Sequence, residues 1–463
     1  MEPENIRFGG GASSTILHPL VALWVAVAVI LILALPRKYV VVPFLAAIFT
    51  IPIGQVLLVG GLHFMMARIL VLAGLLRRAI TKESGPGVVP VAESKSVDHA
   101  YTLCAVCLLV AFSLQWRETQ AFIKAMASFI DALGGYFVLR FFIRDLDDVR
   151  RTIRVFAHLS VILAVCMMIE QVAHLNVFGL LGGTPVVPAM REGDVRSAGP
   201  FEEYITAGVF GATLVPLFVW LWGDGKNKAA AAWGMMGATI ISVTSNSSTT
   251  LMALNAVVVG FLFWPLRNQM RIIRWALVFT LVSLHLVMKA PVWALIARVD
   301  LTGSSSSFHR YALIDNCIRH FSDWWLWGYK NYNDWGWDMW DLSNQYVTYA
   351  LTGGLFTLAA FVALIVRGFR ALGTARRLVQ GDRKKQWLLW CFSTALFSHV
   401  IASFGIGYFD QMQYAWYTLL AMICVVAAQP LAEAVRPAEV PAGRGLETAR
   451  AGAGAWPQAH QWS

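Results

Sequence analysis

Residues 343–366 read SNQYVTYALTGGLFTLAAFVALIV, a run without a charged side chain that is long enough to cross the hydrocarbon core of a bilayer as a helix. The chain as a whole has the same character, because 57% of its 463 residues are hydrophobic and only 14% are charged. Such a composition is too apolar for a soluble globular protein. We therefore predict an all-α fold, a polytopic helical membrane protein with about 12 or 13 transmembrane helices.

Other apolar segments of similar length occupy most of the chain. They are 15–35, 39–59, 61–76, 99–116, 119–143, 155–176, 204–222, 228–244, 248–265, 273–290, 386–408 and 411–430. Segment 61–76 is short and carries Arg68, so twelve spans are an alternative to thirteen. Pro36 follows the first segment where a cleaved signal peptide would need small residues, so we expect that segment to be retained.

Arginine and lysine are concentrated in the connections between these segments, and short cytoplasmic loops carry an excess of both. The basic connections are 37–38, 77–95, 144–154, 226–228, 267–274 and 367–385. In the thirteen-span arrangement all of them lie on one side, which predicts that the amino terminus and the longest loop face the periplasm. Twelve spans would place the amino terminus inside. The net charge of +10 follows from this topology, so we expect no nucleic-acid partner.

The chain is predicted to form one transmembrane domain, 1–430, followed by a disordered cytoplasmic tail, 431–463, that is rich in Ala, Gly and Pro. Two outer connections, 177–203 and 290–342, are much longer than a link between helices requires, so we expect function to reside in them. The six cysteines give no credible disulfide or metal-ligand spacing, because the CxxC of Cys104 and Cys107 lies inside an apolar span, where we expect the two to be packing residues. Neither a metal nor another cofactor is expected.

The loop 290–342 combines aromatic and ionisable side chains. Six tryptophans lie between Trp324 and Trp340, which fits both anchoring at a membrane interface and stacking on sugar rings. A helix with Ser306 or Ser307 as its N-cap would place an apolar set on one face, namely Phe308, Tyr311, Ile314, Ile318 and Phe321. We therefore predict a short amphipathic helix whose imidazole-bearing side, with His309 and His320, faces away from the bundle or membrane surface beneath it.

The loop 177–203 ends in a cluster of charges. Arg196 precedes a turn of small residues, 197–200, which would let backbone amides and the guanidinium face one ligand. A guanidinium fork is suited to bidentate binding of phosphate oxygens. The alternatives are a solvated arginine and an ion pair with Glu202 or Glu203.

Arg68, Asp131 and Arg140 fall inside predicted spans, where an unpaired charge is costly. We expect Asp131, near the middle of its span, to pair with Arg68. Arg140 lies near a span end and is expected to extend to the membrane surface.

Three blocks resemble the superfamily of O-antigen ligases and O-antigen polymerases, which are bacterial envelope glycosyltransferases. They are RSAGPFEEYITAG at 196–208, SNSSTTLMALNAVVVG at 245–260, and 308–366 with its Asn-x-Tyr span start and Gly-Gly-Leu. At two positions the chain departs from the pattern. Ser248 stands where the superfamily commonly has arginine, and Ser343 stands where the ligase branch has histidine.

The resemblance implies a GT-C-like, metal-independent enzyme of the bacterial inner membrane. Its substrate would be an oligosaccharide linked to undecaprenyl pyrophosphate, taken at the periplasmic face, and polysaccharide export or assembly proteins would be further partners. The residues expected at the site fall into two groups. The catalytic bases would be His309, Asp341 and His320 in order of preference, and the substrate-binding residues would be Arg196, Arg310, Arg191, Asn344, Trp335 and Trp337.

Polymerisation of polysaccharide repeat units is the function we expect, since the ligase histidine is replaced. Ligation of a glycan to a lipid or another acceptor is the alternative. A transporter or flippase of lipid-linked glycans, or a scaffold of an export complex, would belong to another class. A transporter would concentrate ionisable residues and broken helices at mid-membrane, whereas here they gather in the two outer loops.

Overall fold

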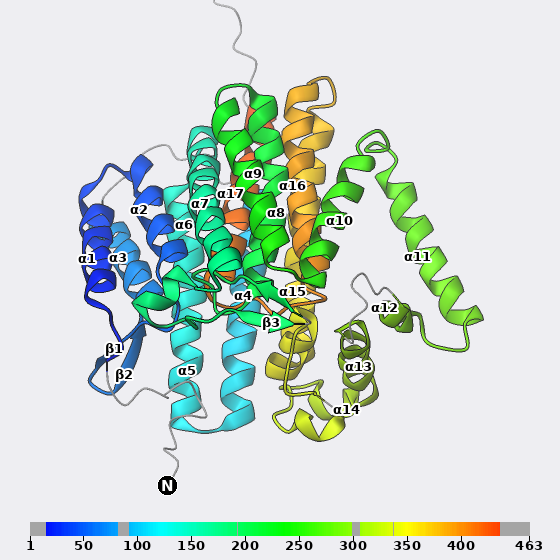
Figure 1. Ribbon diagram of the computed structural model, residues 1–463. Coiled ribbons are helices and arrows are strands. Elements are labelled where there is room, and N and C mark those ends of the chain that lie inside the picture. Colours follow the sequence, from blue (N-terminus) through cyan, green and yellow to red (C-terminus); the bar gives the residue numbers. More distant parts are fainter. Residues whose placement is uncertain (1–14, 82–91, 192, 299–305, 337, 436–463) are drawn as a thin grey trace, which may run out of the picture.

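The computed structural model describes residues 15–81, 92–191, 193–298, 306–336 and 338–435, and within these ranges it is almost entirely helical (Figure 1). The α-helices are α1 (Pro19–Ala34), α2 (Arg37–Thr50), α3 (Met66–Ile80), α4 (Ala92–Trp116), α5 (Thr119–Phe129), α6 (Gly135–Phe142), α7 (Leu146–Ala173), α8 (Tyr204–Asp224), α9 (Lys228–Thr244), α10 (Ser248–Leu262), α11 (Met270–Val287), α12 (Leu295–Arg298), α13 (Ser306–Arg319), α14 (Phe321–Trp324), α15 (Gln345–Leu378), α16 (Arg383–Ala402) and α17 (Asp410–Val435). Short helical turns of other kinds are η2 (Ile130–Gly134), η3 (Val177–Leu181), η4 (Val292–Ala294) and η5 (Tyr332–Trp335).

Seven helical stretches in the described part of the chain are long and apolar enough to cross a membrane. They are Lys95–Trp116, Thr119–Phe142, Leu146–Ala173, Tyr204–Asp224, Met270–Val287, Gln345–Leu378 and Asp410–Pro430. Each of the other predicted segments also contains a helix, among them the short apolar helices α1 and α10. The all-α membrane-type fold is therefore confirmed. The larger number of transmembrane helices stays a prediction.

The second and third predicted segments are wrong at the ends where they face each other. Residues that were expected to continue two spans form an antiparallel hairpin of β1 (Val56–Val59) and β2 (Leu62–Met65). Gly60 and Gly61 make its two-residue turn, and both have positive φ, 58° and 80°. Such a turn matches the twist of a hairpin and favours glycine, which explains why the helix stops here. A second hairpin joins β3 (Ala189–Arg191) to β4 (Asp194–Arg196).

The two ends of the bundle differ in their connections. Both hairpins and α13–α14 lie toward the lower end in Figure 1, which we call the hairpin end. The connections between α1 and α2, between α6 and α7, and between α15 and α16 lie toward the opposite end, which we call the arginine end. Basic residues such as Arg37, Arg151 and Arg383 gather there, as the loop charges predicted.

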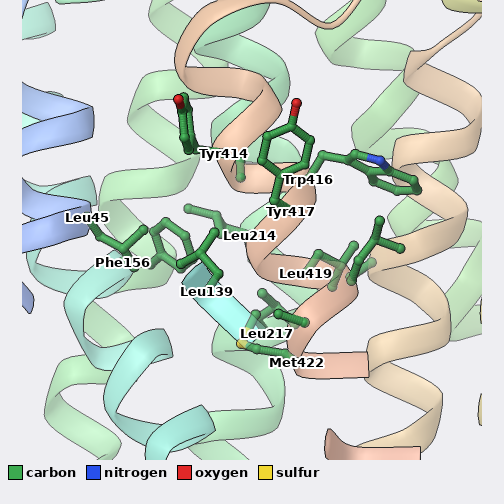
Figure 2. Packing of buried hydrophobic residues seen from close by; sticks show 14 of the residues in the cluster. Leu45, Leu139, Phe156, Leu214, Leu217, Tyr414, Trp416, Tyr417, Leu419 and Met422 are labelled. Atoms are coloured by element: carbon green, nitrogen blue, oxygen red, sulfur yellow. The ribbon is translucent and has the colours of Figure 1, made fainter. Parts of the chain in front are cut away.

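The core lies around α17, which runs through the middle of the bundle. Figure 2 shows Tyr414, Trp416 and Tyr417 from this helix in one cluster with apolar side chains of α2, α6, α7 and α8, with Trp416 pointing to the other side, where it contacts Phe361 of α15 and His399 of α16. α11 is the opposite case, because none of its residues is buried and it stands apart from the other helices in Figure 1. An apolar helix of this kind suits contact with lipid on all sides.

The charged residues Arg68, Asp131 and Arg140 have ionic partners inside the bundle. Arg68 donates to Asp131 at 2.6–3.2 Å, which confirms the predicted pair, and Asp131 lies in the π-helix η2 between α5 and α6. The prediction that Arg140 extends to the membrane surface is wrong. Its guanidinium donates to both oxygens of Asp98 on α4, at 3.0 and 3.1 Å. A partner on a neighbouring helix keeps Arg140 within the bundle.

α15 is interrupted one-third of the way along, at the Gly-Gly-Leu of the sequence. Gly354 has φ 69°, outside the helical range. The break exposes backbone groups that bind the tryptophan-rich loop: Tyr329 donates to the Leu351 carbonyl at 2.8 Å, and Leu355 donates to the Trp325 carbonyl at 2.8 Å. A Cβ on Gly354 would lie 2.4 Å from the Leu326 carbonyl oxygen. The glycine is therefore required for the loop to dock on α15.

Candidate functional site

The three blocks of the resemblance meet at the hairpin end. Arg310 projects from α13 onto the junction between α9 and α10, where its Nη2 donates to Ser248 Oγ at 2.8 Å and to Thr249 Oγ1 at 2.9 Å. Only 5% of Arg310 is exposed. Ser248, which departs from the superfamily pattern, thus holds the arginine of a different block.

The junction that receives Arg310 is built from hydroxyl side chains and close helix contacts. Ser245 and Thr250 lie 3.2 Å apart, and Thr249 Oγ1 donates to the Gly405 carbonyl at 3.0 Å. A Cβ on Gly208 of α8 would lie 2.1 Å from Ser245 Oγ, so glycine lets α8 approach. The Ser-rich block therefore joins α8, α10 and the loop after α16.

His309 lies beside Arg310 on α13 and is 8% exposed. Its Nε2 is 3.0 Å from the Asp338 carbonyl oxygen and 3.9 Å from the Asp338 carboxylate, and its Nδ1 is 3.4 Å from Ser343 Oγ. A carbonyl only accepts hydrogen bonds, so Nε2 carries the proton of the neutral ring. Nδ1 is then the basic nitrogen.

The orientation predicted for α13 is wrong. The expected contact face is exposed at Phe308 (58%), Ile318 (44%) and Phe321 (45%), whereas His309 and Arg310 are buried. The helix also begins at Ser306, so Ser306 and Ser307 lie within it instead of capping it. The apolar face can still lie against a membrane surface, which was one of the two expected arrangements, but the side with His309 packs against protein and does not face away from it.

Each of the two outer loops contributes a carboxyl group with a raised pKa. The pKa of Asp341 is raised by burial, with His309 lowering it and Asp338 raising it further. The pKa of Glu203 is also raised by burial, and next by the charges of Glu202 and Asp341. The charge of Asp341, before α15, therefore acts on Glu203, at the start of α8. Sequence reasoning treated Glu203 only as a partner for Arg196.

Arg196 ends strand β4 and contacts the start of α8. Its Nη1 donates to the Tyr204 hydroxyl at 2.6 Å, and the guanidinium lies 4.7 Å from the centre of the Tyr204 ring. Its Nε is buried without a hydrogen-bond partner in the described part of the chain. Neither Glu202 nor Glu203 is the partner that the alternative interpretation assumed.

The expectation that the backbone amides after Arg196 face a ligand is wrong. The amides of Ala198 and Gly199 already donate to the carboxylate of Glu170 on α7, at 3.0 and 2.9 Å. This contact ties the turn to the bundle, so it positions Arg196 but offers those two amides to no ligand. Arg191 lies one strand earlier, in β3, opposite Asp194 of β4.

Asn344 acts as the N-cap of α15. Its Oδ1 accepts from the amides of Tyr346 and Val347, and its Nδ2 donates to the Phe404 carbonyl at 3.3 Å. The side chain is fully buried. Because α15 begins only at Gln345, Asp341 and Asn344 both precede the helix and do not share a helical face. Asn344 fixes where the loop ends and the helix starts.

His320 and Trp335 lie away from Arg310, at the far end of α13. Trp335 is stacked between His320 and Tyr329, with ring centres 4.5 and 5.1 Å apart and planes within 7° and 6°. Both faces of Trp335 are therefore occupied by protein rings, which leaves no face for a sugar. His320 Nδ1 also contacts the Asn316 carbonyl at 3.0 Å. Trp337 lies outside the described residues.

An apolar groove of about 360 Å³ adjoins the site between α13–α14 and the start of α15. Ile314, Cys317 and Phe321 form one wall, and Val347 and Phe404 contribute to the other. Phe404 belongs to the same loop as Gly405, which binds the Arg310-bearing junction through Thr249. The apolar groove therefore lies beside the junction that holds the Arg310 guanidinium.

Among the described residues, no group of three or more His, Cys, Asp or Glu side chains is arranged to hold a metal ion. Comparisons of the chain with family models and with curated proteins find no match.

Proposed function

We propose that this protein is a glycosyltransferase of the bacterial inner membrane that polymerises polysaccharide repeat units from undecaprenyl-pyrophosphate-linked oligosaccharides at the periplasmic face. The observation that carries the proposal is the convergence of Arg310, His309 and the Ser248–Thr249 junction from separate parts of the chain. A buried cation and a basic nitrogen on adjacent residues are what transfer from an activated sugar requires.

The chemistry follows from the charges. An acceptor hydroxyl attacks the anomeric carbon, the new glycosidic bond forms, and the bond to the diphosphate oxygen breaks with its electron pair leaving on the diphosphate. Arg310, with Arg196 nearer α8, would stabilise that negative charge. The hydroxyl proton would pass to His309 Nδ1, with the Asp341 carboxylate as the second base. Direct attack inverts the anomeric centre.

The amphiphilic surroundings support a lipid-linked substrate. The apolar groove beside α13 is lined by side chains such as Ile314, Phe321 and Val347, which can cover a hydrocarbon chain. Arg310 lies on the same helix as Ile314 and carries the charge that a diphosphate headgroup needs. A polar glycan would then extend away from the lipid, toward the aqueous side of the hairpin end.

Arg310→Lys tests the proposal in purified protein supplied with lipid-linked repeat units. We expect most chain elongation to be lost, because an ammonium cannot reproduce the guanidinium contacts to two hydroxyls and a diphosphate. Arg319→Lys is the matched control on the same helix, since the Arg319 side chain is 69% exposed, and it should retain activity. Equal elongation by both variants at equal abundance would remove Arg310 from the site.

The same assay separates the alternative functions by their products. A polymerase yields a ladder of lengthening lipid-linked glycans. A ligase instead moves one unchanged glycan onto an added lipid or sugar acceptor. A transporter changes neither length nor attachment, so an unaltered substrate with intact protein would contradict both transferase activities.

A further inference from the structure

Four arginines from two separate parts of the chain meet at the arginine end, where α10 is joined to α11. Arg376, near the end of α15, interacts electrostatically with its neighbour Arg377, with Arg267 of the α10–α11 connection and with Arg274 of α11. Arg274 and Arg377 are exposed, and the other two are half-buried. We call these four residues the arginine cluster. Like charges repel, so their proximity requires an explanation.

Tryptophan rings hold two of these arginines in place. Arg267 Cζ lies 4.3 Å from the centre of the Trp264 ring, and Arg376 Cζ lies 5.4 Å from the centre of the Trp390 ring. The two rings pack edge to face with their centres 5.8 Å apart. Arg267 Nε also donates to Gln386 Oε1 at 3.0 Å. Packing therefore fixes both guanidinium groups against one pair of rings, in spite of their repulsion.

The arginine cluster has no carboxylates to balance it. In the described part of the chain, no carboxylate forms an ion pair with any of the four guanidinium groups. Residues 264–274 include no acidic side chain, and residues 376–385 include Asp382 alone. Asp382 is the N-cap of α16 and accepts from two backbone amides of that helix.

Membrane topology alone does not explain this arrangement. Basic residues are expected in cytoplasmic loops, but the rule does not require them to gather around one another. The basic stretch 144–154 at the same end contains its own carboxylates, and Asp148 there binds Arg37 and Arg151. The arginine cluster lacks such partners, so its positive charge is available to an anionic ligand.

Exposed apolar side chains adjoin the arginine cluster. Leu266 is 41% exposed and Trp275 is 70% exposed, and each is next in sequence to an arginine of the cluster. α11 has no buried residue along its whole length and stands apart from the other helices in Figure 1. A soluble anion would make no use of these apolar surfaces, whereas acyl chains would cover them.

We propose that the arginine cluster binds the phosphodiester headgroup of an anionic phospholipid, whose acyl chains lie against the exposed apolar side chains of α10 and α11. A guanidinium group can donate to two phosphate oxygens at once. A zwitterionic headgroup would bring an ammonium group to a site that already has four cations. Basic clusters beside membrane helices attract lipids of net negative charge. The site lies at the opposite end of the bundle from Arg310, so this proposal does not rest on the proposed function.

Native mass spectrometry of the full-length protein, titrated in detergent, tests the lipid preference. The probes are phosphatidylglycerol and phosphatidylethanolamine with identical acyl chains. We expect phosphatidylglycerol to bind at least tenfold more tightly. Equal affinity for the two lipids would overturn the proposal, because the cations would then contribute nothing to binding.

Two double variants with the same change in net charge locate the site. Arg274→Gln combined with Arg377→Gln removes the two exposed members of the cluster. Arg274 Nε donates only to the Met270 carbonyl of its own helix, so the fold should be retained. We expect phosphatidylglycerol to bind at least tenfold more weakly to this variant. Arg370→Gln combined with Arg383→Gln is the matched control, since both arginines are exposed at the same end and neither interacts with Arg376.

The control pair should change the affinity for phosphatidylglycerol less than twofold. An equal loss in the two double variants would overturn the proposal and assign the attraction to general surface charge. Glycerol phosphate, the same chemistry without acyl chains, serves as the competing probe. It should not displace phosphatidylglycerol at equal concentration. Displacement by glycerol phosphate would also overturn the proposal, because the cluster would then be a site for a soluble phosphate.

Discussion

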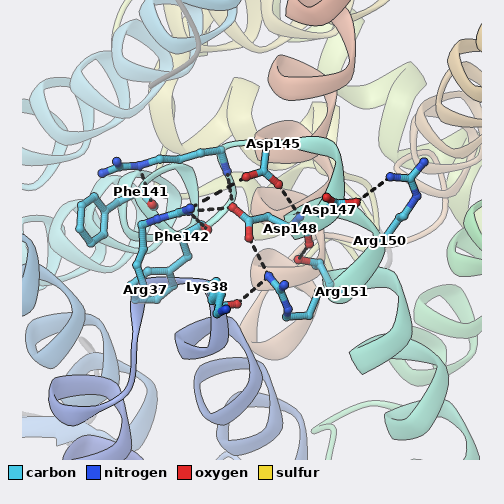
Figure 3. A network of polar contacts seen from close by, with 11 residues as sticks. Arg37, Lys38, Phe141, Phe142, Asp145, Asp147, Asp148, Arg150 and Arg151 are labelled. Atoms are coloured by element: carbon cyan, nitrogen blue, oxygen red, sulfur yellow. Dashed lines mark hydrogen bonds and ion pairs between the residues drawn. The ribbon is translucent and has the colours of Figure 1, made fainter. Parts of the chain in front are cut away.

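The two ends of the bundle differ in the groups that surround their carboxyl side chains. At the arginine end, carboxylates meet cations: Asp148 accepts from Arg37 and Arg151, each at 2.7 Å, and Asp224 accepts twice from Arg150 (Figure 3 shows the network around Asp148). At the hairpin end, ion pairs such as Arg319 with Asp315 also occur, but some carboxyl groups there act on one another, as Asp341 does on Glu203 and Glu202 does on Asp410.

We infer from this contrast that the paired charges at the arginine end stabilise the fold, whereas those at the hairpin end serve a function. Matched ion pairs at the arginine end tie α2, α7 and α8 together and leave nothing for a ligand to do. The hairpin end has like charges, a cation held by hydroxyls, and acceptor atoms without donors among the described residues, such as Gln411 Oε1. Each of these lowers its stability, and such departures from matched pairing are typical of functional sites. The predictions below test this division.

The largest expected difference is the side of the membrane on which each end lies. Single cysteines at Ser322, in α14, and at Gly381, between α15 and α16, lie at opposite ends of the bundle. In a protein lacking its native cysteines, an impermeant maleimide applied to intact spheroplasts should label Ser322→Cys and not Gly381→Cys. The reverse pattern would invert the proposed topology and with it the periplasmic site.

His309→Ala should lower turnover by a factor of ~100 to 10,000, which is the typical effect of losing a general base. Membrane abundance and thermal stability should stay near those of the unmodified protein. Asp341→Asn should have a smaller effect, because the carboxylate is the second base. Turnover measured with lipid-linked substrate decides the order, and an inactive Asp341→Asn beside an active His309→Ala would exchange the two roles.

Asp148→Ala should reduce stability and leave turnover per folded molecule unchanged. The carboxylate is 2% exposed, and its loss leaves Arg37 and Arg151 without their buried partner. Breaking a buried pair typically costs about 3–5 kcal/mol. Asp147→Ala is the matched control, because that side chain is 76% exposed and such pairs contribute ~0–1 kcal/mol. Thermal unfolding in detergent measures both, and equal melting temperatures for the two variants would argue against the division between the ends.

Glu203→Gln should produce the smallest effect, a pH-dependent gain in stability. A carboxyl with a raised pKa binds its proton more tightly when folded, so its contribution to stability falls as the pH rises from the ordinary pKa of 4.5 through the raised value. Removing the charge should therefore raise Tm by ~1–2 °C at about pH 7.5 and leave it unchanged at about pH 4. A gain of equal size at both pH values would show that repulsion at Glu203 is not its cause.

The sequence was sufficient for the helices, because apolar runs long enough to span a bilayer leave the backbone few alternatives. It also predicted the pair of Arg68 with Asp131, since an isolated charge in a span needs a partner. It did not predict Asp98 as the partner of Arg140, because Asp98 lies near a helix end, where an acidic residue is unremarkable. Only helix packing brings the two together.

Several residues of the candidate site could be chosen from the sequence, but the contacts between them could not. Arg310 and His309 were chosen from the sequence as site residues, a choice that stays a prediction, and Ser248, 62 positions before Arg310, was noted only as a lost arginine. Trp335 was chosen for its aromatic ring, and composition cannot tell that His320 and Tyr329 cover both faces. Glu203 and Asp341 became a coupled pair only when α8 and the loop before α15 were placed together.

The break in α15 at Gly354 sets the position of the tryptophan-rich loop along the helix. Trp325 and Tyr329 are hydrogen-bonded to backbone groups freed by the break, so the height of the exposed Trp325 and Trp327 rings is fixed by the helix and not by the lipid. A bilayer of different thickness therefore cannot be accommodated by sliding this loop. It must be met by tilting the bundle or by deforming the surrounding lipid.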